Sequence, residues 1–480
     1  MRKILIIILV ILSFAFNAQP PSKFYTTIGR EGDDVGYSAK QTLDGQYIIA
    51  GSSSSYGGNG STDVYLTKID SMGQPLWEKF YGGFGNEVGK SVIQLPDSGY
   101  VLAGFTNSFG AGGYDAYMLR TDKLGNMIWQ KTFGGSDWDF AADLVLASDG
   151  NIFVVGNTTS FGNGKKDGFV IKYDLSGNLL LQKFIGGVEN EELRSIIKTN
   201  DNFLATVGYT ESKNDINGDG YFLKFDLNGD TVFTKIFGGA YKDFANDLVQ
   251  KSNDDYILCG AKTFSINEKS KSYMYCFDVI GNFNWDNSYY ASTSDENFVS
   301  VANSYQLNSL TVYLRNIPVP SFQQQGNLFL GIPGGWNYKV NSFGGENDEE
   351  CFSIEGTKDG GFLILGSTLS FNSLGKDIYF LKQDSTCYNY TNIVSVKEQQ
   401  KTGTPVIYNG NDKIFTFHFA DGNIPENVSL FTLNGSLVWE FNPLVNHFDH
   451  DFFWLQNGVY VIRLQCKNGY YYNKIIIGWR

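Results

Sequence analysis

The sequence predicts an all-β protein: a seven-bladed β-propeller followed by a small Ig-like β-sandwich. Three observations predict this fold class. The chain of 480 residues contains 55 Gly, 38 Phe and 29 Tyr, whereas charged residues make up only 18%. This composition favours many short strands with glycine-rich turns. No long segment has the sustained 3.6-residue periodicity of a helix, and a repeat of about 52 residues runs through most of the chain.

Each repeat begins with a Gly-Gly frame, as in FGGSDWDFA at residues 133–141. The first position of the frame recurs seven times, with a tyrosine in one unit: Gly29, Gly82, Gly134, Gly186, Gly238, Tyr290 and Gly344. An acid follows five residues later in every unit: Asp34, Glu87, Asp139, Glu191, Asp243, Asp295 and Glu349. Regular spacing of this kind indicates one structural unit per repeat.

Four short strands are predicted within each unit. In the third unit they read AADLVLAS, IFVVGNTT, GFVIKYD and NLLLQKFI. Asp149-Gly150 separates the first two, and a D-x-x-G turn that starts at Asp174 separates the last two. Seven such units predict a seven-bladed propeller over residues 23–388. A solenoid of stacked sheets is the alternative.

The two ends of the repeat region predict that the ring closes. After Asp384 the last unit has no outer strand, but KFYTTIG at residues 23–29 aligns with the outer strands of the other units. We therefore expect the N-terminal strand to complete the last blade and to remove the open sheet edges. A solenoid would not require one repeat to be divided between the two ends of the chain.

The Gly-Gly frame is expected where the chain passes from one blade to the next. Glycine tolerates the backbone angles of a tight crossing, and the acid can accept hydrogen bonds from the N–H groups of that crossing. The rival interpretation is a ring of seven carboxylates that holds a cation at the channel mouth. Such a ring would repel itself unless a metal ion or protons neutralised it.

The first residues, MRKILIIILVILSFAFNAQP, predict an export signal. A basic start precedes an apolar run from Ile4 to Phe16, which as a helix of about 20 Å is shorter than a bilayer core of ~30 Å. Residues 1–18 are therefore predicted to be a secretory signal peptide, with an uncleaved anchor as the alternative. We expect no other transmembrane segment and a location outside the cell or on its surface.

Charge and cysteine content narrow the classes of partner. The net charge of −13 argues against binding of nucleic acid or anionic lipid. The five cysteines match neither a metal motif nor a dense disulfide framework. Cys259 and Cys276 are expected on neighbouring strands, where they could pair or remain buried thiols.

The repeats resemble those of secreted β-propeller proteins of Bacteroidota. The resemblance rests on GG-x-x-x-[DE], then DG-[GN]-[YF]-[IVL]-x-x-G, then D-x-[YF]-[ILV]-x-K-x-D-x-x-G-x-x-x-W-x-K, and it covers roughly residues 23–388. It implies the fold and leaves the activity open, because propellers host many functions.

The C-terminal segment has a different all-β pattern. After a predicted linker at residues 389–404, residues 405–480 read as six or seven short strands, which suit a small sandwich. This tail resembles the C-terminal sorting domain of the type IX secretion system. The residues that carry the resemblance are Leu430 to Gly435, Leu455, Gly458 to Leu464 and Lys474 to Ile477.

The resemblance implies export across the outer membrane by the type IX machinery, removal of the tail, and release or surface attachment. One departure lies at Ile407 to Gly410, where family members carry Tyr-Pro-Asn-Pro. An ordinary terminal sandwich that binds a partner is the alternative.

Histidine content limits the chemistry. All three histidines, His418, His447 and His450, lie in the C-terminal segment, so the propeller cannot build a Ser-His-Asp triad or a His-metal site from its own residues. Paired carboxylates could serve a glycosidase, but the acids occupy repeated positions, which favours a structural role. We expect a non-enzymatic binding or scaffold protein, with a glycan or protein as ligand. The alternative is a carbohydrate-active enzyme.

Two places in the repeats are candidate sites. Asp215, Asn217 and Asp219 follow the D-x-N-x-D-G pattern that surrounds Ca²⁺ with oxygens, so calcium is the one cofactor considered. Asp219, however, is also a repeated position. Trp138 replaces the polar residues that its equivalents carry in the other units, and it could stack on a sugar ring. Packing against a neighbouring blade is the alternative for Trp138.

Overall fold

A computed structural model defines the fold of two compact units, Met1–Asn389 and Tyr390–Arg480. The predicted signal peptide and linker lie outside the described residues. The described ranges are 23–55, 61–212, 217–265, 268–288, 297–304, 311–319, 323–331, 340–343, 347–371, 373–384, 406–409, 414–418, 425–432, 437–443, 447–451, 458–466 and 469–477.

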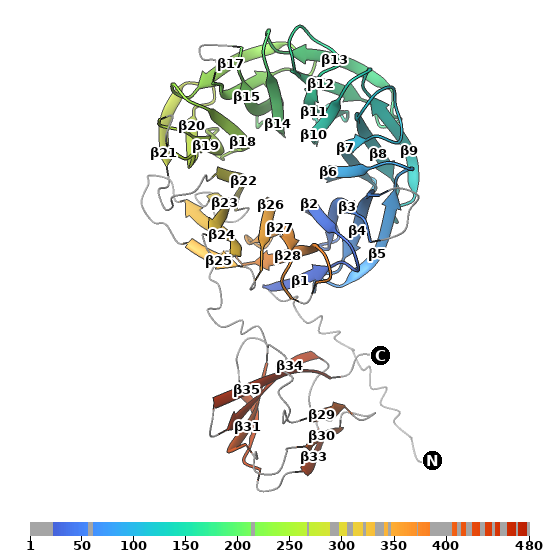
Figure 1. The fold of residues 1–480 in the computed structure, drawn as a ribbon, viewed down its shortest axis with the longest axis vertical. Helices are drawn as coiled ribbons and strands as arrows, with labels where there is room; N and C mark the ends of the chain where they lie inside the picture. Colours follow the sequence, from blue (N-terminus) through green and yellow to red (C-terminus); the bar gives the residue numbers. More distant parts are fainter. Residues whose placement is uncertain are drawn as a thin grey trace, which may run out of the picture. The chain divides into compact units, whose positions relative to one another are not determined.

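The first unit is built from four-stranded antiparallel sheets that surround a common axis (Figure 1). Its described residues form seven of them, numbered here in chain order. Sheets 1 to 3 contain β2 (Asp34–Gln41), β3 (Tyr47–Ser53), β4 (Asp63–Ile69), β5 (Pro75–Tyr81); β6 (Glu87–Gln94), β7 (Tyr100–Thr106), β8 (Asp115–Thr121), β9 (Met127–Phe133); and β10 (Asp139–Leu146), β11 (Ile152–Thr158), β12 (Asp167–Tyr173), β13 (Leu179–Ile185).

The remaining sheets repeat this order, except that the last one takes its outer strand from the N-terminus. Sheets 4 to 6 contain β14 (Glu191–Lys198), β15 (Leu204–Thr210), β16 (Asp219–Phe225), β17 (Thr231–Phe237); β18 (Asp243–Gln250), β19 (Tyr256–Lys262), β20 (Lys271–Phe277), β21 (Phe283–Ser288); and β22 (Asn297–Asn303), β23 (Thr311–Val319), β24 (Gln323–Gly331), β25 (Val340–Phe343). Sheet 7 contains β26 (Glu349–Gly356), β27 (Phe362–Thr368), β28 (Asp377–Gln383) and β1 (Phe24–Ile28).

The middle strands of each sheet form the core. In β11, residues Ile152 to Val155 are at most 1% exposed. A continuous apolar run is expected there, because each sheet packs against a neighbour on both faces. The first residues of the outer strand β13 are not packed against a neighbouring sheet in this way, and Leu179 and Leu180 are exposed. The core therefore lies between the sheets.

The D-x-x-G turns are present as the sequence predicts. In sheet 2, Asp122 Oδ1 accepts hydrogen bonds of 2.8 Å from the N–H groups of Leu124 and Asn126. Gly125 has a φ of 77°, which favours glycine. The same arrangement recurs at Asp174, where N–H groups of Ser176 and Asn178 donate. These turns fix the connection from the third strand of a sheet to its outer strand.

The predicted pairing of the N-terminal strand with the last repeat is confirmed. Strand β1 runs antiparallel to β28, with Thr26 opposite Phe380. Ile28 is 6% exposed, and the ring of Phe24 lies 5.8 Å from that of Phe380. Lys23 forms an ion pair of 3.0 Å with Asp384. The strand is thus held by backbone hydrogen bonds and by side-chain packing.

The junction between sheets 7 and 1 has the same backbone contact as the internal junctions. Asp34 N donates to Lys376 O at 2.6 Å. Equivalent bonds join neighbouring sheets elsewhere. In each, the backbone N–H of the first residue donates to the backbone carbonyl group of the second: Glu87 to Thr62, Asp139 to Tyr114, Glu191 to Lys166 and Asp243 to Gly218. The first and last sheets are therefore neighbours, as a propeller-like fold requires and an open solenoid does not.

The Gly-Gly frame lies at these junctions, but the expected reason for its first glycine is wrong. Gly82, Gly134 and Gly186 do not have positive φ angles. Instead, a Cβ atom at Gly82 would collide with Asp63 and Glu87, and the same holds at the other two glycines. The requirement at these three positions is space for two side chains and not an unusual backbone conformation, whereas Gly238 combines the same crowding with a φ of 154°.

In five of the frames, the described residues show the acid in its predicted structural role. Glu87 Oε2 accepts a hydrogen bond of 2.8 Å from Gly83 N. Matching bonds of 2.6–3.0 Å reach Asp34, Asp139, Glu191 and Asp243. These acids are at most 1% exposed, which contradicts a ring of acids around the channel mouth. The acid of the sixth unit, Asp295, lies outside the described residues.

A second carboxylate faces the acid across the glycine at five junctions. The pairs are Asp63 with Glu87, Asp115 with Asp139, Asp167 with Glu191, Asp219 with Asp243, and Asp377 with Asp34. Among the described residues, Asp34 Oδ1 and Asp377 Oδ1 have no hydrogen-bond partner. Burial first, and then the charge of Asp34, raise the pKa of Asp377 from its ordinary 3.8 to about 6.

The C-terminal unit consists of two sheets in its described residues. One contains β32 (Leu437–Phe441), β31 (Asn427–Thr432), β34 (Gly458–Cys466) and β35 (Gly469–Ile477), and the other β29 (Val406–Asn409), β30 (Ile414–His418) and β33 (His447–Asp451). Val428, Leu430 and Ile462 are fully buried, so this unit has an apolar core of its own.

The cysteines with described side chains are thiols. Cys259, Cys276 and Cys351 are buried and free. Cys259 pairs in register with Met274 and Cys276 with Ile257, so the two cysteines are diagonal neighbours on adjacent strands. Of the two alternatives for Cys259 and Cys276, the structure has the buried thiols.

Replacing Asp377 with Asn should stabilise the chain at alkaline pH. The pKa of Asp377 is higher in the folded than in the unfolded chain. Its contribution to the free energy of unfolding is therefore fully present below about pH 4 and is lost as the pH rises through about 6. The amide of Asp377→Asn carries no charge and can donate to Asp34 Oδ1. We expect a Tm increase of roughly 2 °C at about pH 8 and none at about pH 4, measured by calorimetry.

Asp137→Asn is the control, because Asp137 is exposed on the same side of the ring. A lower Tm for Asp377→Asn at alkaline pH, or an equal shift at both pH values, would contradict the paired-carboxylate explanation.

Candidate functional site

The innermost strand of every sheet carries a β-bulge at the same place. In β2 the register with β3 shifts between Gly36 and Ser38, so Tyr37 has no partner. The same shift occurs in β6, β10, β14, β18, β22 and β26. A bulge turns its extra side chain away from the regular alternation of the strand. These strands surround the axis (Figure 1).

We call the seven extra residues the bulge ring: Tyr37, Lys90, Ala142, Arg194, Asn246, Val299 and Phe352. All seven are partly exposed, and the residue before each of them is buried. Their chemistry differs from sheet to sheet, whereas the bulge itself and the Ser or Asp that follows it are repeated. The bulge ring is therefore a set of seven variable side chains on a constant frame.

Serine or aspartate follows each bulge residue, and six of these seven residues bind a neighbouring innermost strand. Ser91 Oγ donates to Asp143 Oδ1 at 2.6 Å, and Ser195 Oγ donates to Asp247 Oδ1 at 2.7 Å. Backbone groups take part as well, since Ile196 N donates to Asp143 Oδ2 at 2.9 Å. Burial raises the pKa of Asp143, although hydrogen bonds from Ser91 and Ile196 oppose this.

The chain of hydrogen bonds continues on both sides of these residues. Val92 N donates to Ser38 Oγ at 3.3 Å, and Ser300 Oγ donates to Asp247 Oδ2 at 2.7 Å. Ile354 N donates to Ser300 Oγ at 3.2 Å. We call this series of contacts the serine belt. It holds the backbone of neighbouring bulges in a fixed arrangement, so the bulge ring is preorganised.

One part of the bulge ring combines aromatic rings with a cation. Lys90 Nζ lies 3.8 Å from the ring centroid of Tyr37, and the Tyr37 ring lies 4.8 Å from that of Phe352. Among the described residues, no carboxylate lies within ion-pair distance of Lys90 Nζ. Burial lowers the pKa of Lys90 to about 8, and the charge of Glu350 partly opposes this. This part offers a cation and aromatic faces to a ligand.

Another part of the ring is a network of paired charges. Arg194 binds Glu192 through an ion pair of 2.8 Å and donates to Asn246 Oδ1 at 2.9 Å. Lys166 Nζ lies 2.9 Å from Glu192. Burial tends to raise the pKa of Glu192, but the charges of Arg194 and Lys166 outweigh it and hold the pKa at about 2. Because these charges are already paired, this part is better suited to position a ligand by hydrogen bonds.

Trp138 lies just before β10 of sheet 3, four residues before Ala142. Its side chain is 56% exposed. The indole makes edge-on contacts with Tyr114 of the preceding sheet and with Phe140, each at 6.0 Å between ring centroids. Trp138 therefore packs partly against a neighbouring sheet and also keeps an exposed surface. A role in ligand binding stays a prediction.

The predicted calcium residues are only partly described. Asp215 lies outside the described residues. Asn217 Nδ2 donates to Ala240 O at 2.9 Å, and Asp219 is buried as the partner of Asp243 at a sheet junction. Within the described ranges no three His, Cys, Asp or Glu side chains form a metal-binding group. Calcium binding stays a prediction, and Asp219 repeats the role of Asp115 and Asp167.

Sequence reasoning missed the bulge ring and the serine belt. A signal was present, because Ser or Asp recurs at 38, 91, 143, 195, 247, 300 and 353 while the residue before it changes chemistry in each unit. A bulge is defined by the partner strand, however, and the sequence of one strand does not show which residue has no partner.

No protein-family model matches the chain. The regulatory protein FlaEY of Caulobacter vibrioides is 25% identical over 295 residues, which cover 52% of this chain and 29% of that protein. The chain thus spans less than a third of the length of this relative.

Solved structures with a similar arrangement include a secretion component and two enzymes. PorZ, a surface component of the type IX secretion system of Porphyromonas gingivalis, aligns with a TM-score of 0.42 and 10% identity over 90% of this chain and 58% of PorZ. The polysaccharide lyase Uly1 aligns at 0.46 and 11% over 73% and 90% of the two chains. The α-L-arabinofuranosidase Arb93A of Fusarium graminearum aligns at 0.42 and 9% over 67% and 98%. Similarity at this level assigns no activity.

Proposed function

We propose that the chain is a secreted or cell-surface binding or scaffold protein, built as a seven-bladed β-propeller with an Ig-like sorting domain, which binds its ligand through the bulge ring. The observation that carries this proposal is the contrast between constant and variable positions. Seven equivalent bulges present side chains that differ in charge, size and aromaticity. A purely structural position would be expected to repeat, as the serine belt does.

The chemistry of the ring favours a glycan or an acidic peptide as ligand. Tyr37 and Phe352 supply aromatic faces, and Lys90 supplies a cation with no carboxylate partner among the described residues. Trp138 would extend this surface. Aromatic faces contact sugar rings and apolar side chains, and a cation selects ligands with negative charge.

A carbohydrate-active enzyme is the alternative. It would need two carboxylates about 5–9.5 Å apart with different environments. The repeated carboxylate pairs are an unfavourable choice, because they are buried at sheet junctions and occur five times. Glu192 and Glu350, which border the bulge ring and are not repeated in most units, are better candidates for this alternative.

The proposed route to the cell surface rests on the two ends of the sequence. Residues 1–18 have the pattern of a signal peptide, and residues 405–480 resemble a type IX sorting domain, with the type IX machinery as the expected partner. The described residues contain no helix that is long and apolar enough to cross a membrane.

Changes in the bulge ring should alter ligand selection. The labelled chain would be applied to an array of bacterial and plant polysaccharides and acidic peptides, together with Lys90→Gln and Trp138→Ala. We expect Lys90→Gln to weaken binding to the negatively charged members at least tenfold, which corresponds to about 1.4 kcal/mol. The control Lys183→Gln changes an exposed lysine on an outer strand and should have no effect.

Identical profiles for the wild type and both variants would overturn the proposed role of the ring. The same polysaccharides would be assayed for release of reducing ends. Turnover that disappears on replacing Glu192 or Glu350 alone would favour the enzyme.

The mass of the chain recovered from culture medium or from the cell surface tests the export route. We expect a product that lacks residues 1–18 and most of residues 405–480, because both segments would be removed during secretion. A chain truncated before residue 405 should remain in the periplasm. Recovery of the intact 53.5 kDa chain outside the cell, or normal export of the truncated chain, would contradict the proposed route.

A further inference from the structure

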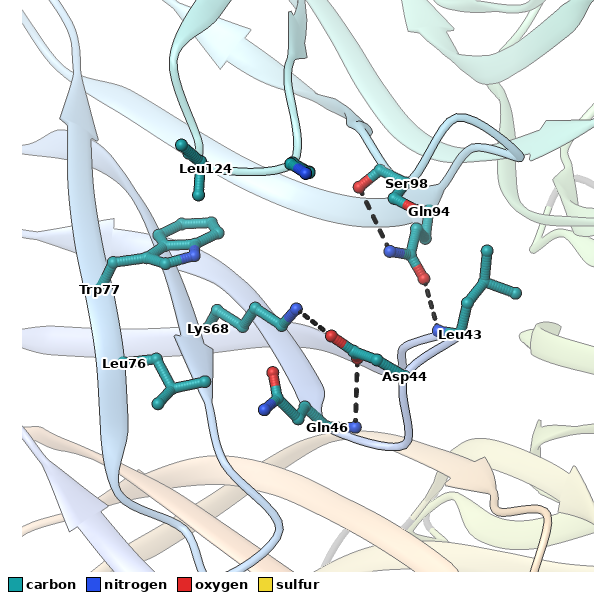
Figure 2. A pocket seen from close by; sticks show the side chains of 10 residues that line it. Leu43, Asp44, Gln46, Lys68, Leu76, Trp77, Gln94, Ser98 and Leu124 are labelled. Atoms are coloured by element: carbon teal, nitrogen blue, oxygen red, sulfur yellow. Dashed lines mark hydrogen bonds and ion pairs between the residues drawn. The ribbon is translucent and has the colours of Figure 1, made fainter.

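A pocket lies between sheets 1 and 2, at the turns that join their strands. Its volume is about 510 Å³, and its lining includes Leu43, Asp44, Lys68, Trp77 and Lys123. Figure 2 shows Trp77 on one side and Leu43 on the other, with the ion pair between Lys68 and Asp44 in the middle. The volume falls in the range of pockets that enclose small ligands.

An ion pair and two hydrogen bonds hold the residues that line the pocket. Lys68 Nζ lies 2.6 Å from Asp44 Oδ2, and the side chain of Lys68 is 11% exposed. Gln94 Oε1 accepts a hydrogen bond of 2.7 Å from Leu43 N, and Gln94 Nε2 donates to Ser98 O at 3.2 Å. The turns of the two sheets are thus tied to each other beside the pocket, so that its walls are preorganised.

The equivalent place between sheets 2 and 3 carries a leucine. There the residue that corresponds to Lys123 is Leu175, which packs against the core cluster of these sheets. Trp129 Nε1 donates to Leu175 O at 3.0 Å, and Arg120 donates to the same oxygen. The leucine side chain thus packs against the core, and its carbonyl group binds both the tryptophan and the cation.

The junction between sheets 3 and 4 has a leucine with similar contacts. Leu227 occupies the position, packs against the local core, and accepts a hydrogen bond of 2.9 Å from Lys172 Nζ. Between sheets 1 and 2, by contrast, the position carries Lys123, which is exposed. Among the described residues, neither Trp77 nor Lys68 donates to its carbonyl group. The pocket therefore coincides with the replacement of this leucine by Lys123.

The side chains that line the pocket indicate which chemical class of ligand it would bind. Trp77, Leu43 and Leu76 provide apolar surface for the C–H face of a ring, and Asp44 and Gln46 provide groups that bind hydroxyls. Lys68 and Lys123 outnumber the single acid Asp44, so the pocket is cationic in a chain of net charge −13. Hydroxyl-binding groups, an indole and an extra cation together fit a sugar that carries a carboxylate or a sulfate.

We propose that this pocket is a binding site for an acidic sugar, with the sugar ring against Trp77 and its anionic group at Lys123. The site uses the turns of sheets 1 and 2 and shares no residue with the bulge ring. It is therefore independent of the function proposed above, and variants at Trp77 and Lys123 distinguish it from the bulge ring.

Calorimetric titration of the full chain with uronate-bearing and sulfated disaccharides tests the site. Lys123→Leu restores the residue found at the two following junctions, and Trp77→Leu restores the leucine that sheet 3 carries as Leu181. Both variants should fold, because the repeat already contains these residues. We expect each to weaken binding at least tenfold, and we expect higher salt to weaken the wild type, because Lys123 is exposed.

Lys198→Leu is the matched control, since Lys198 is an exposed lysine on sheet 4. It should bind like the wild type. Neutral disaccharides of the same linkage should bind at least tenfold more weakly than the acidic ones. The proposal is overturned if none of the acidic disaccharides binds at about 10 mM, if neutral and acidic sugars bind equally, or if Lys123→Leu has no effect.

Discussion

The pairing of β1 with β28 is the constraint on which the first unit depends. A row of sheets that packs face to face leaves two uncovered faces and an unpaired strand edge unless its ends meet. Here the ends meet because the chain supplies the outer strand of its last sheet from its N-terminus. The contact from Asp34 to Lys376 then repeats the contact found at the internal junctions. Every sheet thereby gains a neighbour on both sides, which allows the middle strands to be buried.

Neighbouring sheets are joined by a small set of repeated polar contacts. On one side of the ring, an acid caps the Gly-Gly crossing and faces a second carboxylate, an arrangement that leaves Asp34 and Asp377 with unpaired oxygens. Nearer the middle of the innermost strands, the serine belt links one bulge to the next. These contacts occupy the repeated positions. Function is expected where the repeat varies, which is at the bulge ring and at the turn that carries Lys123.

The sequence predicted the features that depend on local chemistry and spacing. The D-x-x-G turns follow from the way Asp122 binds nearby N–H groups, and the split last sheet follows from the match between residues 23–29 and the other outer strands. Features that depend on a partner strand or sheet were not predicted. In the sequence, Tyr37 resembles any other strand residue, and only the pairing with β3 shows that it has no partner. The pocket depends on a difference between sheets, because Trp129 donates to the carbonyl group of Leu175 and Trp77 has no equivalent bond among the described residues. The reason expected for the first glycine was wrong. This glycine is required because two side chains from different sheets occupy the space beside it, and one repeat alone does not show that contact.

Hydrogen exchange of the β1 amides tests the closure of the ring most directly. If β1 completes the last sheet, the Phe24–Ile28 amides that bond to β28 should exchange at least about a hundredfold more slowly than an unstructured chain, and their protection should fall together with that of β28 on mild destabilisation. Exchange of these amides at the unstructured rate, with β28 still protected by β27, would show that the N-terminal strand does not hold the ends together and would contradict the account.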